Sequence, residues 1–293
     1  MLIAQELTAI QEVNFKCRFF AALMSLYTAS LNSGSNGNCY YISNGKDAVL
    51  IDAGLSCRET EIRMKAMGLQ INKVRAIFIT HEHTDHIKGA QLLSSRYKIP
   101  VYLNHQTHYS SHLKFKPELY HRIEHEQIVD VNGISVTGFS KIHDAIDPFS
   151  FVVSYEGITI GVFTDIGAVC DNLTKYMHQC HAAYLESNYD EQMLENGKYP
   201  IHLKNRIRGG HGHLSNMQAL EFFITHRPAH MTHLFLSHLS RDNNNPELAL
   251  QLFKARAEGV QVFVASRHHH SDIFHITTGE EASVQPLKQA ALF

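Results

Sequence analysis

The sequence predicts an α/β fold, and three observations support this prediction. Short apolar runs rich in β-branched residues, such as 74–79, are too short for independent helices and are typical of buried strands. Between such runs lie amphipathic stretches with helix-ending signals, such as 58–67 followed by Gly68. Clusters of titratable residues directly follow several of the apolar runs, which is where α/β folds place their chemistry.

Turn residues divide the first part of the chain. Turn clusters at 32–38 and at Asn44-Gly45 bound short apolar runs, and Pro100 stops a helix that is expected from His86 to about Tyr97. With these boundaries, strands are expected at 25–31, 39–43, 48–51, 74–79 and 101–103.

The second part of the chain shows the same alternation. Residues 134–139 alternate between polar and apolar side chains, and Glu156-Gly157 is suited to turn a hairpin. Ser215 is suited to cap a helix over 216–225. Further strands are expected at 150–155, 158–163, 182–185, 233–237 and 260–265, and a last helix at 246–256.

Composition limits the class of protein. A chain of 293 residues with 44% hydrophobic residues can bury a substantial core, and we expect a single domain over 24–293 preceded by an N-terminal extension over 1–23. A formal net charge of -2 argues against a protein that coats nucleic acid through bulk charge, although a local basic groove remains compatible with it.

Cysteine usage and hydropathy bear on location. The five cysteines are scattered without a Cys-x-x-Cys pair, which argues against a disulfide framework and fits a reducing cytoplasm. The sequence has no apolar stretch long enough to span a bilayer, so we expect no membrane partner and a cytoplasmic location. The oligomeric state stays open.

Residues 80–86 form the densest cluster of titratable groups, with three imidazoles and the carboxylates of Glu82 and Asp85 directly after a strand. His81 and His83 point the same way in an extended chain, whereas Asp85 and His86 aim differently. Four donors this close cannot all serve one tetrahedral ion, so the loop predicts two metal ions with two ligands each. The alternative is a polar surface loop in a chain with 22 histidines, but the spacing after an apolar strand favours the metal site.

This loop resembles the signature of the metallo-β-lactamase-fold hydrolases. The resemblance implies a four-layer αββα sandwich with two mixed β-sheets, and three more metal ligands at the ends of downstream strands. His143, Asp165 and His238 each follow an expected strand in the right order. The resemblance also implies that Asp52, at the end of 48–51, supports the metal loop without binding metal.

The site that follows from the resemblance holds two divalent ions, zinc or manganese, since imidazole and carboxylate serve both. One ion is expected on His81, His83 and His143, the other on Asp85, His86 and His238, with Asp165 bridging them. A water between two dications becomes a hydroxide nucleophile near neutral pH, and Asp85 is expected to orient it.

Two further motifs narrow the class of hydrolase. Gly212-His213-Leu214-Ser215-Asn216 and Leu236-Ser237-His238-Leu239-Ser240-Arg241 resemble those of ribonuclease Z and its phosphodiesterase relatives. That resemblance implies that His213 lies over the metals and assists departure of the leaving oxygen. The alternative is that Ser215 only caps the following helix and that His213 is an ordinary turn residue. This alternative accounts for Ser215 better than for His213. The chain departs from ribonuclease Z in that Arg241 follows Ser240 directly.

A larger set of motifs covers most of residues 25–267. This set resembles the YycJ/WalJ group of bacterial cytoplasmic proteins. It comprises the stretches above together with 33–38, 52–56, 185–188 and 236–244. This resemblance implies metal-dependent exonuclease activity on DNA, in the 5′-to-3′ direction.

Substrate contacts are expected around these motifs. The basic stretch 198–208 contains no Asp or Glu and, as a loop, could track a phosphate backbone, although an ordinary solvated loop has the same composition. The turn 33–38 could offer backbone N–H groups to a phosphate. The candidate substrate-binding residues are Ser33, Asn36, Lys204, Arg208, Ser240 and Arg241.

Two other functions compete with a DNA exonuclease. The same site could hydrolyse a small thioester, lactone or cyclic phosphodiester, or the metals could stabilise a non-catalytic regulatory protein. The remaining histidines are not expected to bind the metals, because they follow no strand in a ligand pattern. They are His105, His108, His112, His121, His125 and the run His268-His269-His270.

Overall fold

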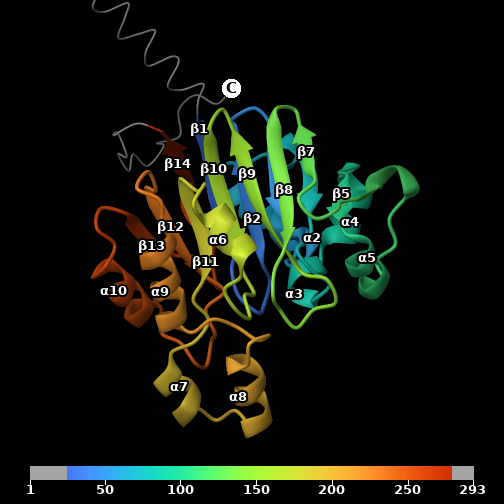
Figure 1. Cartoon of the computed structure of the whole chain (residues 1–293). Helices are drawn as coiled ribbons and strands as arrows, with labels where there is room; N and C mark the ends of the chain where they lie inside the picture. The colour runs from blue at the N-terminus through green and yellow to red at the C-terminus, as the bar shows by residue number, and fades with distance from the viewer. Residues whose placement is uncertain (1–24, 279–293) are drawn as a thin grey trace, which may run out of the picture.

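The computed structural model describes residues 25–278 and contains two seven-stranded β-sheets packed face to face, with helices on both outer faces (Figure 1). The prediction of a four-layer αββα sandwich is confirmed. The N-terminal extension expected over 1–23 lies outside the described residues.

The two sheets divide the described chain roughly in half. The first has the order β14-β1-β2-β3-β4-β5-β6 and the second β13-β12-β11-β10-β9-β8-β7, each mixing parallel and antiparallel pairs. The first sheet comprises β1 Ser25–Asn32, β2 Cys39–Ser43, β3 Ala48–Ile51, β4 Val74–Phe78, β5 Val101–Leu103, β6 Tyr120–Arg122 and β14 Phe274–Thr277. The second comprises β7 Ile128–Val131, β8 Ile134–Ser140, β9 Phe149–Tyr155, β10 Ile158–Phe163, β11 Ala182–Glu186, β12 His233–Ser237 and β13 Gln261–Val264.

Helices cover the two outer faces. On the first sheet lie α2 Cys57–Ala66, α3 Thr84–Ile87 and α4 Ala90–Tyr97, with α5 His105–Ser111 beside them. On the second lie α6 Asp171–Met177, α9 Asn216–His226 and α10 Pro246–Lys254. Two single turns of 3₁₀ helix, Ile71–Lys73 and Pro117–Leu119, precede β4 and β6. Among residues 25–278, no helix is both long and apolar enough to cross a bilayer.

Three apolar layers hold the sandwich together, and the alternation of side chains along each strand explains them. Along β2, Tyr40 and Ile42 point into the core between the sheets, whereas Tyr41 points outward under α2 and α4. The second sheet repeats this arrangement, with Tyr184 facing inward and Leu185 facing α6 and α9. Both sheets are therefore buried on both faces, as α/β sandwiches require.

The helix expected from His86 to about Tyr97 is wrong as one element, because α3 and α4 are separated at Gly89. The backbone N–H of Gly89 donates to the carbonyl of Ala53 at 2.7 Å. A Cβ on Gly89 would lie only 2.1 Å from the carbonyl oxygen of Leu55. This close packing fixes the metal loop against the chain that follows β3.

The basic stretch 198–208 is also not the loop that we expected. It contains α8 Ile201–Arg208, which pairs with α7 Glu191–Asn196 in a small helical arm over 191–208. The arm projects from the same edge of the sandwich as α3 (Figure 1).

Candidate metal centre

The candidate ligands converge because several strands end at one edge of the sandwich. Strands β10, β11 and β12 run parallel, and so do β3 and β4 in the other sheet. Three residues that directly follow or lie just beyond these strand ends have a positive φ: Asp52 at 62°, Asp165 at 54° and His238 at 54°. Such left-handed backbone is uncommon outside glycine, although Asp and His adopt it more often than most residues, and it is concentrated at functional sites.

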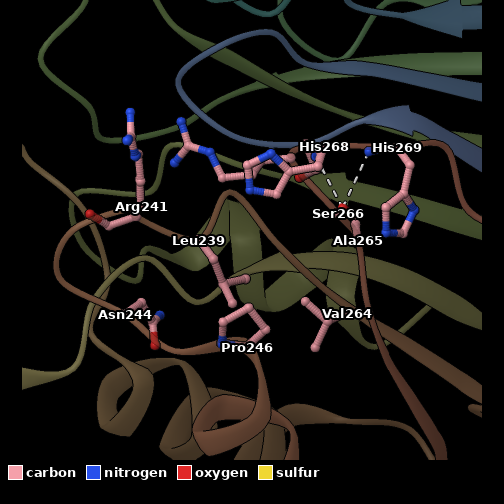
Figure 2. Close-up of a pocket in the computed structure, with 12 residues that line it drawn as sticks. Leu239, Arg241, Asn244, Pro246, Val264, Ala265, Ser266, His268 and His269 are labelled. Carbon is pink, nitrogen blue, oxygen red and sulfur yellow. Dashed lines mark hydrogen bonds between the residues drawn. The ribbon is translucent and has the colours of Figure 1, made fainter.

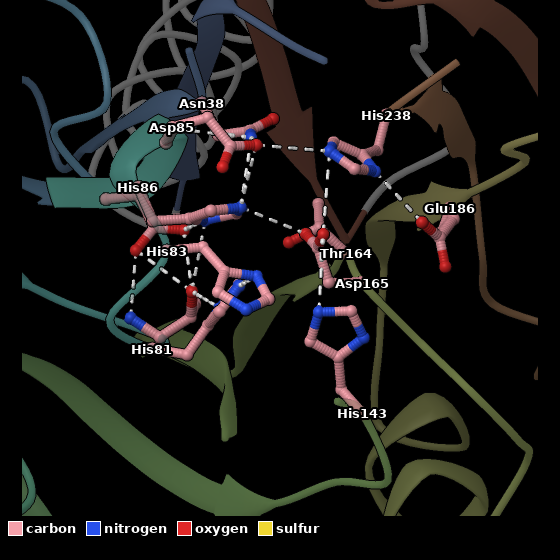
Figure 3. A network of polar contacts seen from close by, with 12 residues as sticks. Asn38, His81, His83, Asp85, His86, His143, Thr164, Asp165, Glu186 and His238 are labelled. Carbon is pink, nitrogen blue, oxygen red and sulfur yellow. Dashed lines mark hydrogen bonds and ion pairs between the residues drawn. The ribbon is translucent and has the colours of Figure 1, made fainter. Parts of the chain in front are cut away.

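His81, His83 and His143 form one cluster of nitrogen donors. Their ligand-type atoms all lie within 4.8 Å of one another. His81 Nε2 is 3.1 Å from His83 Nδ1, and the ring of His143 lies 5.0 Å from that of His81. The three rings come from the two different sheets and face a common space (Figure 3).

Asp85, His86 and His238 form the second cluster, again with ligand-type atoms within 4.8 Å of one another. Asp85 Oδ2 lies 3.5 Å from both His86 Nε2 and His238 Nε2. Asp165 lies between the clusters, with its two oxygens 3.2 Å from His86 Nε2 and 3.8 Å from His143 Nε2. The structure thus brings all seven predicted ligands together.

The buried atoms of this site fit metal ions. His143 Nε2, His238 Nε2 and Asp165 Oδ2 are buried and make no hydrogen bond within the described chain. Leaving such atoms unpaired is costly, and all three point toward the same space. Imidazole nitrogen and carboxylate oxygen are ligands of zinc and of similar divalent ions.

Asp52 lies behind the metal loop and holds it by hydrogen bonds. His86 Nδ1 donates to Asp52 Oδ2 at 2.7 Å, and the backbone N–H of Thr80 donates to Asp52 Oδ1 at 2.8 Å. The hydroxyl of Thr80 lies 2.9 Å from Nδ1 of His81. These contacts leave Nε2 of both histidines facing the site, which is how supporting residues orient metal ligands.

Asn38 contacts the site as well, a contribution that the sequence did not reveal. Its Nδ2 donates to Asp85 Oδ2 at 3.2 Å and lies 3.1 Å from His86 Nε2. Its backbone N–H donates to the carbonyl of Asp85 at 2.7 Å. The turn cluster that contains Asn38 was the available signal, but it did not show that the side chain faces the metal loop.

Glu186 is the second contribution that sequence reasoning missed. Its Oε1 accepts from Nδ1 of His213 at 2.7 Å and from Nδ1 of His238 at 3.0 Å. Its Oε2 accepts from the backbone N–H of Ile166 at 2.7 Å. Glu186 therefore orients two histidines, and its ligand-type atoms also lie within 4.8 Å of those of Asp165, His213 and His238. Its position at a strand end was visible in the sequence, but its partners were not.

His213 lies over the candidate ligands. Its ring is 5.3 Å from the rings of both His143 and His238, and its side chain is about one-fifth exposed, at 19%. The hydrogen bond to Glu186 fixes Nδ1 as a donor, so Nε2 is the nitrogen available to a bound molecule.

The electrostatics of the site follow from its burial. Burial lowers the pKa of His81 well below its usual value and that of His143 to about 4, so both imidazoles are neutral, as ligands must be. Burial also opposes a charge on His238, but the carboxylates of Asp165, Asp85 and Glu186 raise its pKa to about 10. The same carboxylates favour a cation beside Nε2 of His238, where a bound metal ion would replace the proton.

Several groups that were predicted to contact substrate already have hydrogen-bond partners within the protein. The buried hydroxyl of Ser33 accepts from the backbone N–H of His238 at 2.8 Å and lies 2.8 Å from the hydroxyl of Tyr40. The backbone N–H groups of Ser33, Gly34, Gly37 and Asn38 all donate within the protein. This turn supports the site from beneath and does not offer these groups to a phosphate.

The helical arm is also less available for substrate than its composition suggested. The ammonium of Lys204 is directed to the carbonyl of Glu195, and Arg208 forms an ion pair with the Glu195 carboxylate at 2.8 Å.

The other predicted substrate contacts lie outside the arm. Asn36 donates to the carbonyl of Arg267 at 2.8 Å. Of the predicted substrate contacts, Ser240 and Arg241 lie beside a cavity near His238.

Comparison with known proteins agrees with this geometry. Residues 33–241 match the metallo-β-lactamase superfamily. The chain belongs to this superfamily. It is 35% identical over 231 residues to exodeoxyribonuclease YycJ of Bacillus anthracis, covering 77% of this chain and 87% of that protein. It is 32% identical over 224 residues to exodeoxyribonuclease WalJ of Streptococcus pneumoniae strain D39, covering 75% and 83%.

A solved structure shows the same fold. The metallo-β-lactamase-fold protein YhfI of Bacillus subtilis aligns with a TM-score of 0.65 at 15% identity, covering 86% of this chain and 99% of that one. The protein is therefore a hydrolase of the metallo-β-lactamase fold, and this fold implies divalent metal ions. The resemblance to the YycJ/WalJ group is confirmed.

Proposed function

We propose that the protein is a DNA exonuclease that hydrolyses phosphodiester bonds with two divalent ions, and that it proceeds in the 5′-to-3′ direction. The relatives named as exodeoxyribonucleases support the reaction and the substrate. The direction rests on resemblance to that group. We further propose His81, His83 and His143 as ligands of one ion, Asp85, His86 and His238 as ligands of the other, and Asp165 as the bridge.

The observation that carries the proposal is the contact between Glu186 and His213, because it supplies an acid where a leaving group would depart. Burial opposes the charge on Glu186, but His213 and His238 lower the pKa of this carboxyl to about 2, so it is ionised at working pH. The ionised Glu186 holds Nδ1 of His213 as a donor and leaves Nε2 directed at a bound molecule. His213 Nε2 then donates a proton to the leaving oxygen of the cleaved ester.

The remaining residues of the site position the reacting groups. Divalent ions bound by the proposed ligands would supply Lewis-acid chemistry, activating water and neutralising a phosphate. Asp85 lies 3.5 Å from His86 and from His238, and its side chain is partly exposed, so its carboxylate can orient that water. Asp52 and Asn38 hold the metal loop in place.

Hydrolysis of a small substrate is the second candidate, and one observation favours it. The cations of the helical arm are largely neutralised, since Arg206 pairs with Asp144 at 2.5 Å and Arg208 with Glu195 at 2.8 Å. An arm with few free charges attracts a long phosphate backbone only weakly.

A direct assay separates these functions. Metal-loaded protein is incubated with single- and double-stranded DNA labelled at the 5′ or the 3′ end, and in parallel with a chromogenic phosphodiester and a thioester. Asp85→Ala and His213→Ala are tested alongside His211→Ala, a matched control that removes an exposed histidine two residues away. Stepwise loss of nucleotides from one end, abolished by Asp85→Ala and reduced by His213→Ala but not by His211→Ala, is the expected result.

Other outcomes have distinct meanings. Turnover of only the small substrates would overturn the exonuclease and support the second candidate. No turnover with any metal, although two ions bind, would overturn both enzymes and leave a metal-stabilised regulatory protein. Release of nucleotides from the 3′ end would keep the nuclease and reverse the proposed direction.

A further inference from the structure

A cavity lies beside the candidate metal centre, and none of the seven proposed metal ligands lines it. Its volume is about 390 Å³, and its walls come from the chain that follows β12 and from the chain that follows β13. Leu239, Pro246 and Val264 gather on one side, while Arg241, His268 and His269 lie along the opposite rim (Figure 2). The cavity thus combines an apolar wall with a basic rim.

Two guanidinium groups at this cavity lack an acidic partner. Neither Arg241 nor Arg267 forms an ion pair with any carboxylate of residues 25–278, and Nη1 of Arg267 is buried without a hydrogen bond. Burial, followed by repulsion from Arg241, lowers the pKa of Arg267, whereas the charge of Asp242 acts in the opposite direction. The carboxylate of Asp242 accepts a hydrogen bond from the hydroxyl of Tyr199 at 2.9 Å and forms no ion pair with either arginine. Two guanidiniums at one cavity, neither of them in an ion pair, favour an anionic ligand.

The backbone around these arginines is fixed before any ligand binds. Asn36 Nδ2 donates to the carbonyl of Arg267 at 2.8 Å, and the N–H of Ser33 donates to the carbonyl of Ser266 at 3.0 Å. Arg63 Nη2 donates to the carbonyl of His268 at 3.1 Å. A rigid site loses little entropy on binding, so this arrangement suits recognition better than a mobile surface loop would.

The cavity is connected to the metal centre through a shared residue. Ser33 lines the cavity, and its hydroxyl accepts from the backbone N–H of His238. Leu239, Ser240 and Arg241 directly follow His238 in the chain and continue into the cavity wall. A strand end held in the cavity would therefore lie next to the metal centre.

We propose that this cavity binds the terminal phosphate monoester of a nucleic-acid strand together with its nucleoside. A terminal phosphate carries a charge of about -1.5 to -2 at pH 7, which matches two guanidiniums better than an internal diester with a single charge. The apolar wall of Leu239, Pro246 and Val264 is suited to the sugar and base, and the volume falls in the range of small-ligand sites, about 300–1,000 Å³. This inference rests on the proposed nuclease function and deepens it.

Binding of small probes tests the cavity without requiring catalysis. The affinities of thymidine 5′-monophosphate, thymidine 3′-monophosphate, thymidine and inorganic phosphate are measured by calorimetry on the full metal-loaded chain. Arg241→Gln and Arg267→Gln are compared with Arg256→Gln, which removes an exposed arginine at the far end of α10. We expect one of the two monophosphates to bind the parent protein at least tenfold more tightly than phosphate or thymidine does. The affinity for that monophosphate should fall at least tenfold in Arg241→Gln and in Arg267→Gln, but not in Arg256→Gln.

Equal affinity in all variants would overturn the inference, since the phosphate would then be held by the metals. Equal affinity for phosphate and nucleotide would overturn the role of the apolar wall. Degradation of phosphorylated and unphosphorylated DNA at the same rate, unchanged by the arginine variants, would refute the cavity and leave the nuclease standing. Arginine-dependent nucleotide binding without DNA degradation would refute the nuclease and leave the cavity standing.

Discussion

Nδ1 of His213 lies 2.7 Å from Oε1 of Glu186, and the same oxygen lies 3.0 Å from Nδ1 of His238. One carboxylate oxygen thus orients both a candidate metal ligand and a candidate proton donor. The two imidazoles present their Nε2 atoms toward the same space, so the proposed proton donor and the proposed metal ligand share a single buried supporting residue.

The first prediction concerns proton transfer by His213. Replacement by alanine removes the proposed proton donor while leaving the proposed metal ligands in place. We expect His213→Ala to lower kcat by about 10²–10⁴-fold, the usual size of general acid catalysis. Metal content measured by mass spectrometry should match that of the parent protein. Unchanged kcat, or loss of metal together with activity, would contradict the role of proton donor.

As part of the same prediction, Glu186→Gln tests the shared carboxylate. The Gln amide would place its NH₂ group either against the backbone N–H of Ile166 or against both histidine Nδ1–H groups, which share Oε1 in the parent protein. We expect both a lower kcat and a metal affinity reduced by about 10–100-fold, as is usual for residues that orient metal ligands. Titration of the metal-free variant with zinc, followed by circular dichroism to verify folding, measures the effect. A fall in kcat at unchanged metal affinity would show that Glu186 acts on His213 alone.

The edge at which the site lies could be predicted from the sequence because the strands that carry the ligands are long and apolar. β4, β10 and β12 are buried along nearly their whole length, so their ends are visible in the sequence. The short edge strands β6, β7 and β14 were not predicted. Edge strands of three or four residues with few buried side chains give little periodic signal.

Support of the ligands could be predicted only in part. The support by Asp52 was expected through the resemblance to the metallo-β-lactamase-fold hydrolases, because its position at a strand end matches theirs. Asn38 and Glu186 act on residues that are 47 and 52 positions away in the chain, at Asp85 and His238. Such contacts depend on the register of two sheets, which a single sequence does not specify. The pairing of the charges in the basic stretch 198–208 could not be predicted for a similar reason, because the acidic partner of Arg206 is the distant Asp144.

The second prediction concerns Asp165 and metal removal. Because ligands that bind only the folded state stabilise it, chelation of the metals should lower Tm. Saturation at 1,000-fold above Kd corresponds to about 4 kcal/mol, or roughly 10 °C for a chain of this size. Asp165→Ala should bind fewer than two ions per chain and show a smaller loss of Tm on chelation. Two ions retained in Asp165→Ala would rule out the bridging role.

The third prediction concerns acid sensitivity, and it lies away from the metals. His233 on β12 is 4% exposed and packs among Phe235, Phe263 and Phe274. Burial, with a smaller contribution from His275, lowers its pKa to about 4. The unfolded chain therefore binds the extra proton as the pH falls from about 6.5 to 4, and stability is lost in that window.

His233→Phe should remove this part of the acid sensitivity. Between pH 7 and pH 5 the parent protein should lose about 1–2 kcal/mol more of its free energy of unfolding than the variant does. Urea denaturation at the two pH values measures the difference, and His178→Phe serves as a control on a more exposed histidine of α6. The same loss in parent and variant would show that His233 does not contribute.

The last prediction concerns Gly54, which holds the metal loop at close range. A Cβ at this position would lie 1.6 Å from the carbonyl oxygen of Asp85 and 2.6 Å from the backbone nitrogen of Asn38. Neither atom belongs to a flexible side chain, so Gly54→Ala must shift the loop that carries Asp85 and His86 by more than 1 Å. A misplacement of that size costs about 10²-fold in rate. We expect Gly54→Ala to lower kcat and metal affinity together, measured by the nuclease assay and by zinc titration. Gly210→Ala is the control, since its Cβ meets no atom within 4 Å. Full activity in Gly54→Ala would mean that the loop tolerates displacement and that the close contact does not position the ligands.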